Sequence, residues 1–520
     1  MPEEKKASMP EEKKVSRRNY LKYAGAGIVV VAVAGAGAYY AMSPTAAPPS
    51  TTEMTTAPPP TTQTTSAPAP TTAVGPWSLA EAAKPYKGQK LTVLTYSGQY
   101  YREWSLDTAA KYFTPLGIDI VCEEYSPDTA IEKMTADFMG KVGAYDVIGI
   151  YAGPCLYPEE IGAAVPISSF FNDPKLFDPN WNPDDFEPNF QKYLGYWDSA
   201  NKTNFGGTWS GLAYAFDGQI FFYRTDLFDK YSKQFESEYG RPLKPALTWD
   251  DTIQMGEFFT KKVPGYYGFV VHGASAVDTF SEWLAILYSC DGRQVEGSIA
   301  EKNLKPAFNN DAGLKSLQIY KQMADLSPPG SNTFSGTDVI DTYLKGKVAM
   351  SQEWSFLGAI SEIPDRAAQE VLGNVRASLI PGLKEEWAGR STAGGNAWTI
   401  SQYSKNPGLA WLFIQQMNSR ETEKYAATTW AIHPGRVSNR NDPEVVNKLG
   451  WYFPVLVESY NRTMAIQGGY LVTLPENTEV QQIAWTNISS VLVGQKQPQD
   501  ALNAMEKGWL DVFRSAGYTT

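Results

Sequence analysis

An alternation of strand-like and helix-like segments opens the apolar-rich part of this sequence. Residues 90–96, 118–123 and 145–151 are apolar runs rich in β-formers, and the segments between them carry apolar residues at helical spacing. A β-α-β-α-β order is typical of a parallel sheet with helices on both faces, and such sheets bind ligands at the carboxyl ends of their strands. The alternation therefore predicts an α/β protein with a site at one edge of its sheet.

The residues at the carboxyl ends of the first and third predicted strands are candidates for contacting a ligand. They are Tyr96, Ser97, Gln99 and Tyr151. The loop after the first strand reads SGQYYREW, which lacks the GxGxxG spacing that lets a backbone approach a pyrophosphate. We therefore expect that this site does not bind a nucleotide.

The size and charge of the chain limit the number of lobes and the kinds of partner that we expect. The chain has 520 residues, 43% of them apolar, which is more than a single core of roughly 250 to 300 residues accommodates, so two lobes or domains are expected. The net charge of −11 leaves no broad basic surface, so nucleic acid is not an expected partner. Aromatic residues make up 13% of the chain, which suits either stacking surfaces or a large aromatic core.

The cysteines and histidines do not form a metal-binding pattern. Cys122, Cys155 and Cys290 contain no CxxC pair, and the only histidines, His272 and His433, lie far apart in the sequence. We expect no metal, no cofactor and two structural histidines. A disulfide between Cys122 and Cys155 stays open, because spacing alone does not test its geometry.

The N-terminal segment predicts export and a membrane anchor. Within residues 1–23, the run SRRNYLK that begins at Ser16 resembles a twin-arginine export signal. Residues 24–42 carry no charge and reach about 28 Å as a helix, enough to span the hydrocarbon of a bilayer. Lys and Arg residues precede this segment, so we expect the N-terminus in the cytoplasm and the body outside. Cleavage near Ala41 is the alternative to a retained transmembrane anchor.

A Thr/Pro-rich segment follows the predicted anchor. Residues 43–75 are almost entirely Thr, Pro, Ser and Ala and hold nothing large enough to build a core, so we expect a disordered, extended stalk. Its threonines suit O-glycosylation, and Asn201, Asn461 and Asn487 stand in N-glycosylation sequons, so a glycoprotein is predicted.

The stretch 211–228, which reads GLAYAFDGQIFFYRTDLF, places an acid beside a glycine at Asp217 and Gly218, just before an apolar run rich in β-formers. One interpretation is a buried strand flanked by turns. The other is a hinge strand that crosses between two lobes, with a ligand contact at Asp217. Asp217 could instead cap a helix or brace the hinge.

Six segments in the right order resemble family 1 of the extracellular solute-binding proteins of ABC importers, and within it the trehalose and maltose binders. The first is the 211–228 stretch, and TWDD at 248–251 resembles the start of a helix in that family. The remaining four are 280–292, 343–356, 393–419 and 471–513. Together they extend the resemblance over residues 88–513.

This resemblance implies a periplasmic-binding-protein-like fold, in which two α/β lobes are joined by hinge strands. The lobes would comprise 88–217 plus 396–436, and 223–393 plus 437–520. The chain would cross between them at 218–222, at 394–396 and near Arg436.

The resemblance also implies site residues. Asp217 stands where the sugar binders carry an acid, Trp354 stands at the stacking tryptophan, and Gly395 belongs to the glycine pair of the second crossing. Asn396 stands where those binders often carry Trp, and Tyr151 lies where many relatives have an aspartate. The identity of the ligand therefore stays open.

A sugar would use two kinds of contact. Its apolar C–H face stacks on an aromatic ring, and its rim of hydroxyls bonds to carboxylates or amides. Besides Trp354, Trp283 and Trp430 could supply faces, and Gln99 could supply a rim beside Asp217 and Asn396. For each tryptophan, packing in the core is the alternative.

These observations favour an extracellular receptor that closes two lobes over a sugar or oligosaccharide and delivers it to an ABC permease. The expected partners are therefore a small solute, the permease subunits and, through the N-terminal helix, the membrane. The alternatives are a secreted glycoside hydrolase, which would need two carboxylates across a cleft, a receptor for a peptide or polyol, and an adhesive surface protein. The receptor would not be an enzyme.

Overall fold

The computed structural model describes residues 77–520 with the exception of Gly98, Gln467 and Val472. The predicted signal region 1–23, anchor 24–42 and stalk 43–75 lie outside the described residues. Among the helices that the structure describes, none combines the length and the apolar character needed to cross a bilayer.

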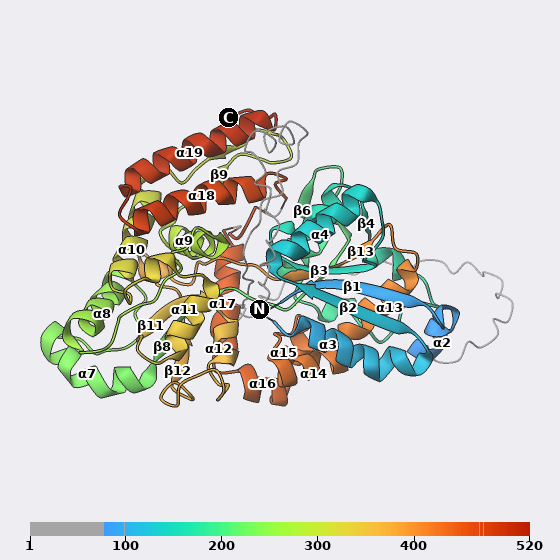
Figure 1. The fold of residues 1–520 in the computed structure, drawn as a ribbon, viewed down its shortest axis with the longest axis horizontal. Helices are drawn as coiled ribbons and strands as arrows, with labels where there is room; N and C mark the ends of the chain where they lie inside the picture. Colours follow the sequence, from blue (N-terminus) through green and yellow to red (C-terminus); the bar gives the residue numbers. More distant parts are fainter. Residues whose placement is uncertain (1–76, 98, 467, 472) are drawn as a thin grey trace, which may run out of the picture.

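Figure 1 shows the molecule as two bodies lying side by side, one built on the strands coloured blue to teal and the other on green and yellow segments. We call the first lobe 1 and the second lobe 2. Each contains its own sheet, and helices surround both sheets. This arrangement agrees with the prediction of two α/β lobes.

Lobe 1 is built on a six-stranded sheet. Its strands run in the order β2-β1-β3-β13-β4, and β7 also pairs with β13. β1, β2 and β3 are parallel, whereas β13 runs antiparallel to β3. The bounds are β1 Lys90–Tyr96, β2 Asp119–Tyr125, β3 Val147–Tyr151, β4 Ala164–Val165, β7 Leu212–Tyr214 and β13 Asn396–Ser401. The predicted alternation of strands and helices is therefore confirmed for the first three strands.

Helices cover this sheet and a separate hairpin lies beside it. The helices are α2 Leu79–Ala83, α3 Tyr101–Thr108, α4 Pro127–Gly140, α5 Tyr157–Glu160, α6 Pro188–Leu194, α13 Pro407–Met417, α14 Arg420–Trp430, α15 Val437–Arg440 and α16 Pro443–Leu449. The hairpin strands are β5 Tyr196–Asp198 and β6 Thr203–Trp209. A π-helical turn, Ala109–Phe113, continues α3.

Lobe 2 contains an antiparallel sheet in the order β11-β8-β12, with β8 Gln219–Arg224, β11 Met350–Trp354 and β12 Val375–Ser378. Every residue of α9, Val277–Ser289, is buried, so this helix forms the centre of the lobe. The other helices are α7 Thr225–Tyr239, α8 Trp249–Lys262, α10 Asp311–Asp325, α11 Gly336–Leu344, α12 Phe356–Ile360, α17 Phe453–Met464, α18 Asn477–Leu492 and α19 Pro498–Ser515. A short hairpin joins β9 Val295–Glu296 to β10 Lys305–Pro306.

Two segments that we predicted to cross between the lobes are hydrogen-bonded to each other. Gly218 and Ala393 form an antiparallel bridge. The Gln219 amide donates to the carbonyl of Thr392 at 3.3 Å, and the Ser391 hydroxyl donates to the carbonyl of Gln219 at 2.6 Å. The bonds hold the start of β8 beside the chain that leads into β13.

A buried histidine joins a third segment to this junction. His433 Nδ1 lies 2.9 Å from the carbonyl oxygen of Phe216, and its Nε2 lies 2.6 Å from the hydroxyl of Tyr452. Because the carbonyl only accepts, Nδ1 donates, and burial lowers the pKa of His433 to about 3, so the ring is neutral and Nε2 accepts from Tyr452. His433 is therefore a structural histidine that ties the crossing chain to lobe 2.

The position of Arg436 bears on where the third crossing lies. Arg436 is buried against lobe 1, where it donates to the carbonyl of Trp181 at 2.6 Å and pairs with Asp185 at 3.1 Å. Helix α16 packs on α14. We therefore propose that the third crossing follows α16, near residue 450, rather than lying at Arg436. The rest of the predicted division of residues between lobes stays a prediction.

Gly395 occupies a position that only glycine fits. Its φ of 125° lies in a region that side chains rarely adopt, and an added Cβ would approach ring carbon Cε2 of Phe190 to 2.3 Å and Cδ1 of Leu194 to 2.5 Å. Its carbonyl accepts from the Ala152 amide at 2.6 Å. The close packing of α6 against this chain explains the glycine without any ligand.

We expect Gly395→Ala to lower the free energy of unfolding by about 3 kcal/mol, because it adds both backbone strain and a clash. Gly162→Ala is a matched control, since Gly162 has a φ of 68° but nothing within 4 Å of its added Cβ. The control should lose only about 1 kcal/mol. Urea unfolding measures both values, and equal losses would contradict the packing argument.

Candidate functional site

Three of the predicted site residues of lobe 1 meet at the carboxyl ends of its strands. Tyr96 ends β1, Tyr151 ends β3, and Asn396 begins β13 directly opposite Tyr151. The Tyr96 hydroxyl donates to Asn396 Oδ1 at 2.5 Å, and the rings of Tyr96 and Tyr151 meet edge to face with centroids 5.4 Å apart. Gly395 is next to this group because it immediately precedes Asn396 in the sequence.

Two further tyrosines complete the group, and our sequence analysis missed both. Asn396 Nδ2 donates to the Tyr101 hydroxyl at 3.0 Å, and the ring of Tyr101 lies 5.4 Å from that of Tyr214. Burial raises the pKa of Tyr101 and Tyr96 above the usual range, so these phenols keep their protons. The tyrosine pair in SGQYYREW was the signal that could have pointed to Tyr101.

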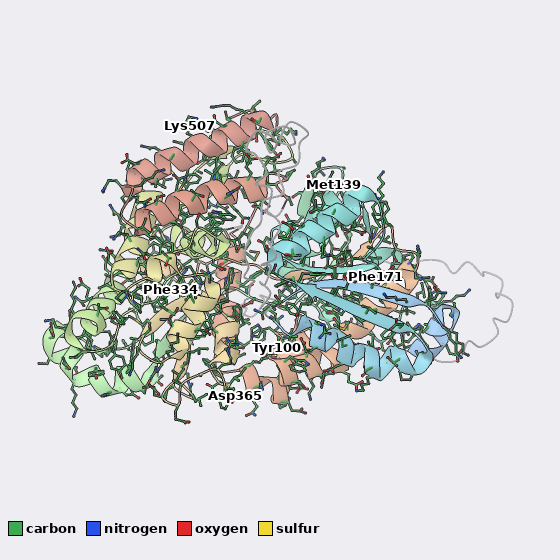
Figure 2. The ribbon with its side chains drawn as sticks, in the orientation of Figure 1. Tyr100, Met139, Phe171, Phe334, Asp365 and Lys507 are labelled. Carbon is green, nitrogen blue, oxygen red and sulfur yellow. The ribbon has the colours of Figure 1, made fainter. Side chains whose placement is uncertain are left out.

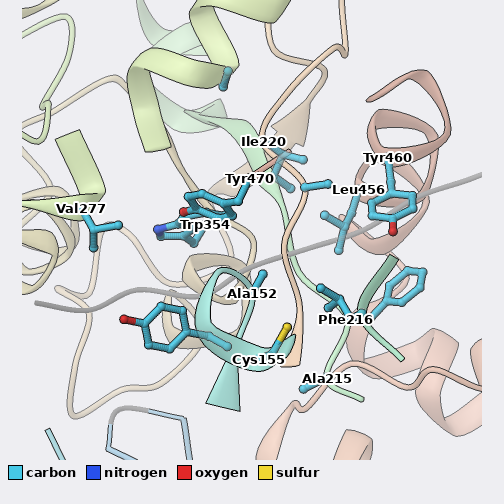
Figure 3. Close-up of a cluster of buried hydrophobic side chains, with 14 of the residues drawn as sticks. Ala152, Cys155, Ala215, Phe216, Ile220, Val277, Trp354, Leu456, Tyr460 and Tyr470 are labelled. Carbon is cyan, nitrogen blue, oxygen red and sulfur yellow. The ribbon is translucent and has the colours of Figure 1, made fainter. Parts of the chain in front are cut away.

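On lobe 2, Trp354 ends β11, one strand away from the first crossing. Its backbone amide donates to Glu353 Oε1 at 2.7 Å, and its indole Nε1 donates to Asp278 Oδ1 at 3.4 Å. The indole is fully buried. Figure 3 draws it in one buried cluster with Tyr470 of lobe 2 and with Ala152 and Cys155 from the chain after β3.

Asp217 lies between the crossing and the end of β11. Its Oδ1 accepts from the Ser355 hydroxyl at 2.5 Å, and the backbone amides of Ser355 and Phe356 also bond to this carboxyl. Ser355 precedes α12, so Asp217 caps that helix and braces the hinge, two roles that its sequence position left open. Burial raises the pKa of Asp217 well above its usual value.

Behind Trp354 lies a buried group of acids around His272. Glu282 Oε2 accepts from the His272 amide at 2.8 Å, from His272 Nδ1 at 2.9 Å and from the Tyr320 hydroxyl at 2.8 Å. His272 Nε2 lies 3.2 Å from Glu353 Oε2. Burial alone lowers the pKa of His272, but the carboxylates of Glu353 and Glu282 outweigh it and raise that pKa well above the usual value. His272 is therefore a cation held between two glutamates.

This wall of lobe 2 carries more acids than bases. Asp217, Asp278, Glu282 and Glu353 are all buried, and His272 is the basic partner that the structure gives them. Within residues 77–520, apart from the three omitted positions, no ion pair joins these acids to Lys or Arg. Sequence analysis missed Asp278, Glu282 and Glu353, although an acid inside each of the apolar runs FSEWLAIL and GKVAMSQEW could have indicated Glu282 and Glu353.

Other predicted site residues lie apart from these two groups. Trp283 is a core residue: its indole donates to Ser316 Oγ at 2.9 Å, and its ring packs against Phe280 and Phe308. Because α9 is buried all round, we leave Trp283 out of the proposed site. Ser97 is exposed and Gln99 is half-buried, both in the loop after β1.

Trp430 ends α14 at the border of lobe 1 rather than within the tyrosine group. Its ring stacks on Tyr100, with centroids 5.2 Å apart and an interplanar angle of 22°. Its indole Nε1 donates to Asp107 Oδ2 at 3.3 Å. Sequence analysis did not single out Tyr100.

The cysteines and acids of the described chain form no metal site. No group of three or more His, Cys, Asp or Glu side chains in that part of the chain could hold a metal ion. Cys122, Cys155 and Cys290 are buried free thiols, so Cys122 and Cys155, whose pairing the spacing left open, are not bridged. Burial raises the pKa of the Cys122 thiol to about 12, which keeps it unreactive.

Comparison with known proteins gives a consistent result. Residues 107–449 match the model of a family described as bacterial extracellular solute-binding protein. A protein of Deinococcus radiodurans named as a probable ABC transporter-binding protein is 24% identical over 320 residues, which cover 60% of this chain and 71% of that protein.

Solved structures show the fold. An ABC transporter solute-binding protein of Agrobacterium radiobacter in complex with ribitol has a TM-score of 0.69 at 23% identity, covering 83% of this chain and 99% of that one. A solute-binding protein of Agrobacterium vitis with D-mannitol gives 0.67 at 21% identity, covering 83% and 100%. Maltose-bound MalE3 of T. maritima gives 0.66 at 17% identity, covering 82% and 100%. The predicted periplasmic-binding-protein-like fold is therefore confirmed.

The buried acids predict an unusual pH dependence of stability. Burial, with smaller contributions from Glu353 and Glu282, raises the pKa of Asp278 to about 7, although His272 and the Trp354 bond oppose it. The folded state then binds more protons than the unfolded state between about pH 4 and pH 7, so Asp278 makes stability fall as pH rises through that window.

Asp278→Asn removes the carboxyl group that binds this proton. We expect its free energy of unfolding to fall less steeply with pH than that of the unaltered protein, by up to about 1.4 kcal/mol per pH unit near pH 6. Urea unfolding at pH 5, 6 and 7 at constant ionic strength measures the slopes. Asp365→Asn, at an exposed aspartate of lobe 2 (Figure 2), should keep the original slope. Identical slopes for all three proteins would contradict a raised pKa at Asp278.

Proposed function

The chain belongs to the family of bacterial extracellular solute-binding proteins, and we propose that it captures a sugar or polyol between its two lobes and delivers it to the permease of an ABC importer. The observation that carries the proposal is the pairing of Gly218 with Ala393. This bridge holds the start of β8, which leads to the Trp354 wall, beside the chain that leads to Asn396. One junction therefore connects two polar and aromatic surfaces of different lobes.

The chemistry of these surfaces suits a polyhydroxylated solute. An indole stacks on the C–H face of a pyranose, and phenols, amides and carboxyls bond to hydroxyls. We assign the ligand contacts of lobe 1 to its strand ends and those of lobe 2 to the end of β11 and the crossing. The proposed contacts are Tyr96, Ser97, Gln99, Tyr151, Asp217, Trp354, Gly395 and Asn396. The similar structures that hold ribitol, mannitol and maltose support this class of ligand.

Burial of the proposed contacts defines how the ligand enters. Trp354 is fully covered and Tyr96 nearly so, so a solute reaches them only when the lobes move apart. A solute that touches both surfaces stabilises the closed arrangement, and this shifts the population of conformations toward closure. The permease would then receive the closed, loaded form.

The buried acids near Trp354 determine which charge of solute lobe 2 accepts. Among the described residues, His272 is the basic partner of Asp217, Asp278, Glu282 and Glu353, and it already lies between two glutamates, so the wall offers an anionic solute no free cation in a desolvated site. We therefore expect neutral sugars and polyols to bind in preference to phosphorylated or carboxylated ones.

The location of the protein is also part of the proposal. The family is extracellular. The twin-arginine-like signal, the apolar segment 24–42 and the Thr/Pro-rich stalk 43–75 support a body held outside the membrane by a single N-terminal helix. Glycosylation of the stalk or of exposed Asn201 would be compatible with this location. Asn487 is a poor acceptor, because it is buried and donates to the carbonyl of Ile483 at 2.7 Å.

Thermal unfolding of residues 77–520 against a panel of sugars, polyols, peptides and anions tests the proposal. A sugar or polyol at a hundredfold excess over its Kd should stabilise the protein by about 2.7 kcal/mol, whereas sugar phosphates should not. No shift by any sugar or polyol would contradict the proposal. Hydrolysis of an oligosaccharide, followed by chromatography, would instead indicate a glycoside hydrolase.

Replacement of Trp354 tests the stacking contact. Trp354→Ala should weaken binding of the active solute at least about tenfold, or ~1.4 kcal/mol, because the aromatic face is lost, whereas Trp354→Phe should retain part of the affinity. Trp387→Ala, at a half-buried tryptophan of the same lobe, is the control and should bind normally. Calorimetric titration measures the affinities. An unchanged affinity of Trp354→Ala would show that Trp354 packs in the core and does not contact the solute.

A further inference from the structure

A groove on lobe 1 runs outward from the border between the lobes. It lies between α3 with its π-helical extension and α14, which run antiparallel, because Asp107 faces Tyr425 and Lys111 faces Glu421. Its volume is about 640 Å³, within the range of small-molecule sites. Asp107, Lys111 and Tyr112 line it from the first helix, and Glu421, Tyr425 and Thr428 line it from the second.

An aromatic pair stands at the inner end of this groove. Tyr100, just before α3, stacks on Trp430, the last residue of α14. Tyr100 is 41% exposed, and Figure 2 labels it at the border between the lobes. Asp107 connects the pair to the groove, because its Oδ2 accepts from Trp430 Nε1 at 3.3 Å and from the Tyr425 hydroxyl at 2.7 Å.

The backbone of Tyr100 is strained. Its φ of 53° lies in the left-handed region, which costs a residue with a side chain about 1–2 kcal/mol relative to glycine. A structural aromatic would recover this cost by full burial, but Tyr100 stays 41% exposed. Strain of this kind concentrates at ligand-binding positions.

The groove has the chemistry of a saccharide site rather than of an apolar docking surface. Its lining combines the rings of Tyr112 and Tyr425 with the carboxylates of Asp107, Glu421 and Glu444 and the hydroxyl of Thr428. These groups match the apolar faces and hydroxyl rims of successive sugar units. At the outer end, the ion pair between Lys111 Nζ and Glu421 Oε1 spans the two helices at 2.7 Å.

We propose that this groove is an outer subsite, which binds the protruding end of an oligosaccharide whose other end is held between the lobes. Tyr100 and Trp430 form its stacking platform, and Asp107 and the half-buried Thr428 supply its hydroxyl contacts. The inference rests on the proposed function, because the inner sugar unit occupies the cleft. On this proposal the cleft alone holds a disaccharide, whereas a longer chain gains affinity from the groove.

Calorimetric titration with chains of two lengths tests the subsite. The probes are disaccharides and hexasaccharides of α-1,4-glucan, β-1,4-glucan, β-mannan, β-xylan and β-galactan. At least one series should show a hexasaccharide affinity five or more times that of its disaccharide. Tyr100→Gly should abolish this gain and leave the disaccharide affinity unchanged, whereas Tyr100→Phe, which keeps the ring, should keep the gain.

Thermal unfolding of the same variants separates a binding role from a structural one. Tyr100→Gly relieves the left-handed strain, so its Tm should equal or exceed that of the unaltered protein, whereas loss of a structural ring would lower the Tm. The subsite is overturned if the gain survives in Tyr100→Gly, or if disaccharides or polyols bind but no series shows a gain. If no saccharide or polyol binds at all, the proposed function fails as well.

Discussion

The whole architecture depends on a small set of hydrogen bonds where the chain passes between the lobes. Gly218 pairs with Ala393, and His433 bridges Phe216 and Tyr452 as a neutral ring. Hydrogen bonds between a few extended segments hold the lobes together at this junction, and segments of this kind serve as hinges because their backbone dihedrals absorb the rotation. The same junction fixes how the end of β11 in lobe 2 faces the strand ends of lobe 1.

The sequence predicts those parts of the structure that local pattern determines. Strand and helix alternation in the first half of lobe 1 follows from hydrophobic period. The acid-glycine pair before a β-rich run left a buried strand and a hinge strand both open, and the family resemblance of 211–228 favoured the crossing at 218–222. Asn396 and Tyr151 were chosen from separate segments, and the sheet register makes them direct neighbours. The family and the fold were also predicted correctly.

Long-range packing determines the features that the sequence did not predict. The residues next to Trp283 in the sequence do not distinguish a ligand contact from a core residue. Only the fold shows that every residue of its helix, α9, is buried. The acids around His272 come from distant segments, and only the fold makes them partners. Gly395 was predicted as a ligand contact, and the fold adds a second reason for a glycine there, because the ring of Phe190 leaves no room for a side chain. Arg436 joins lobe 1 through Asp185, which no local pattern indicates.

The central claim is that a solute closes the two lobes, and a distance between them tests it most directly. Spin labels on cysteines placed at Met139 of lobe 1 and Lys507 of lobe 2, both labelled in Figure 2, report that distance, since the native thiols are buried and free. With a saturating sugar or polyol, we expect one narrow distribution at shorter distance, and without it a broader distribution that includes longer distances. An unchanged distribution on binding of the solute would contradict the account.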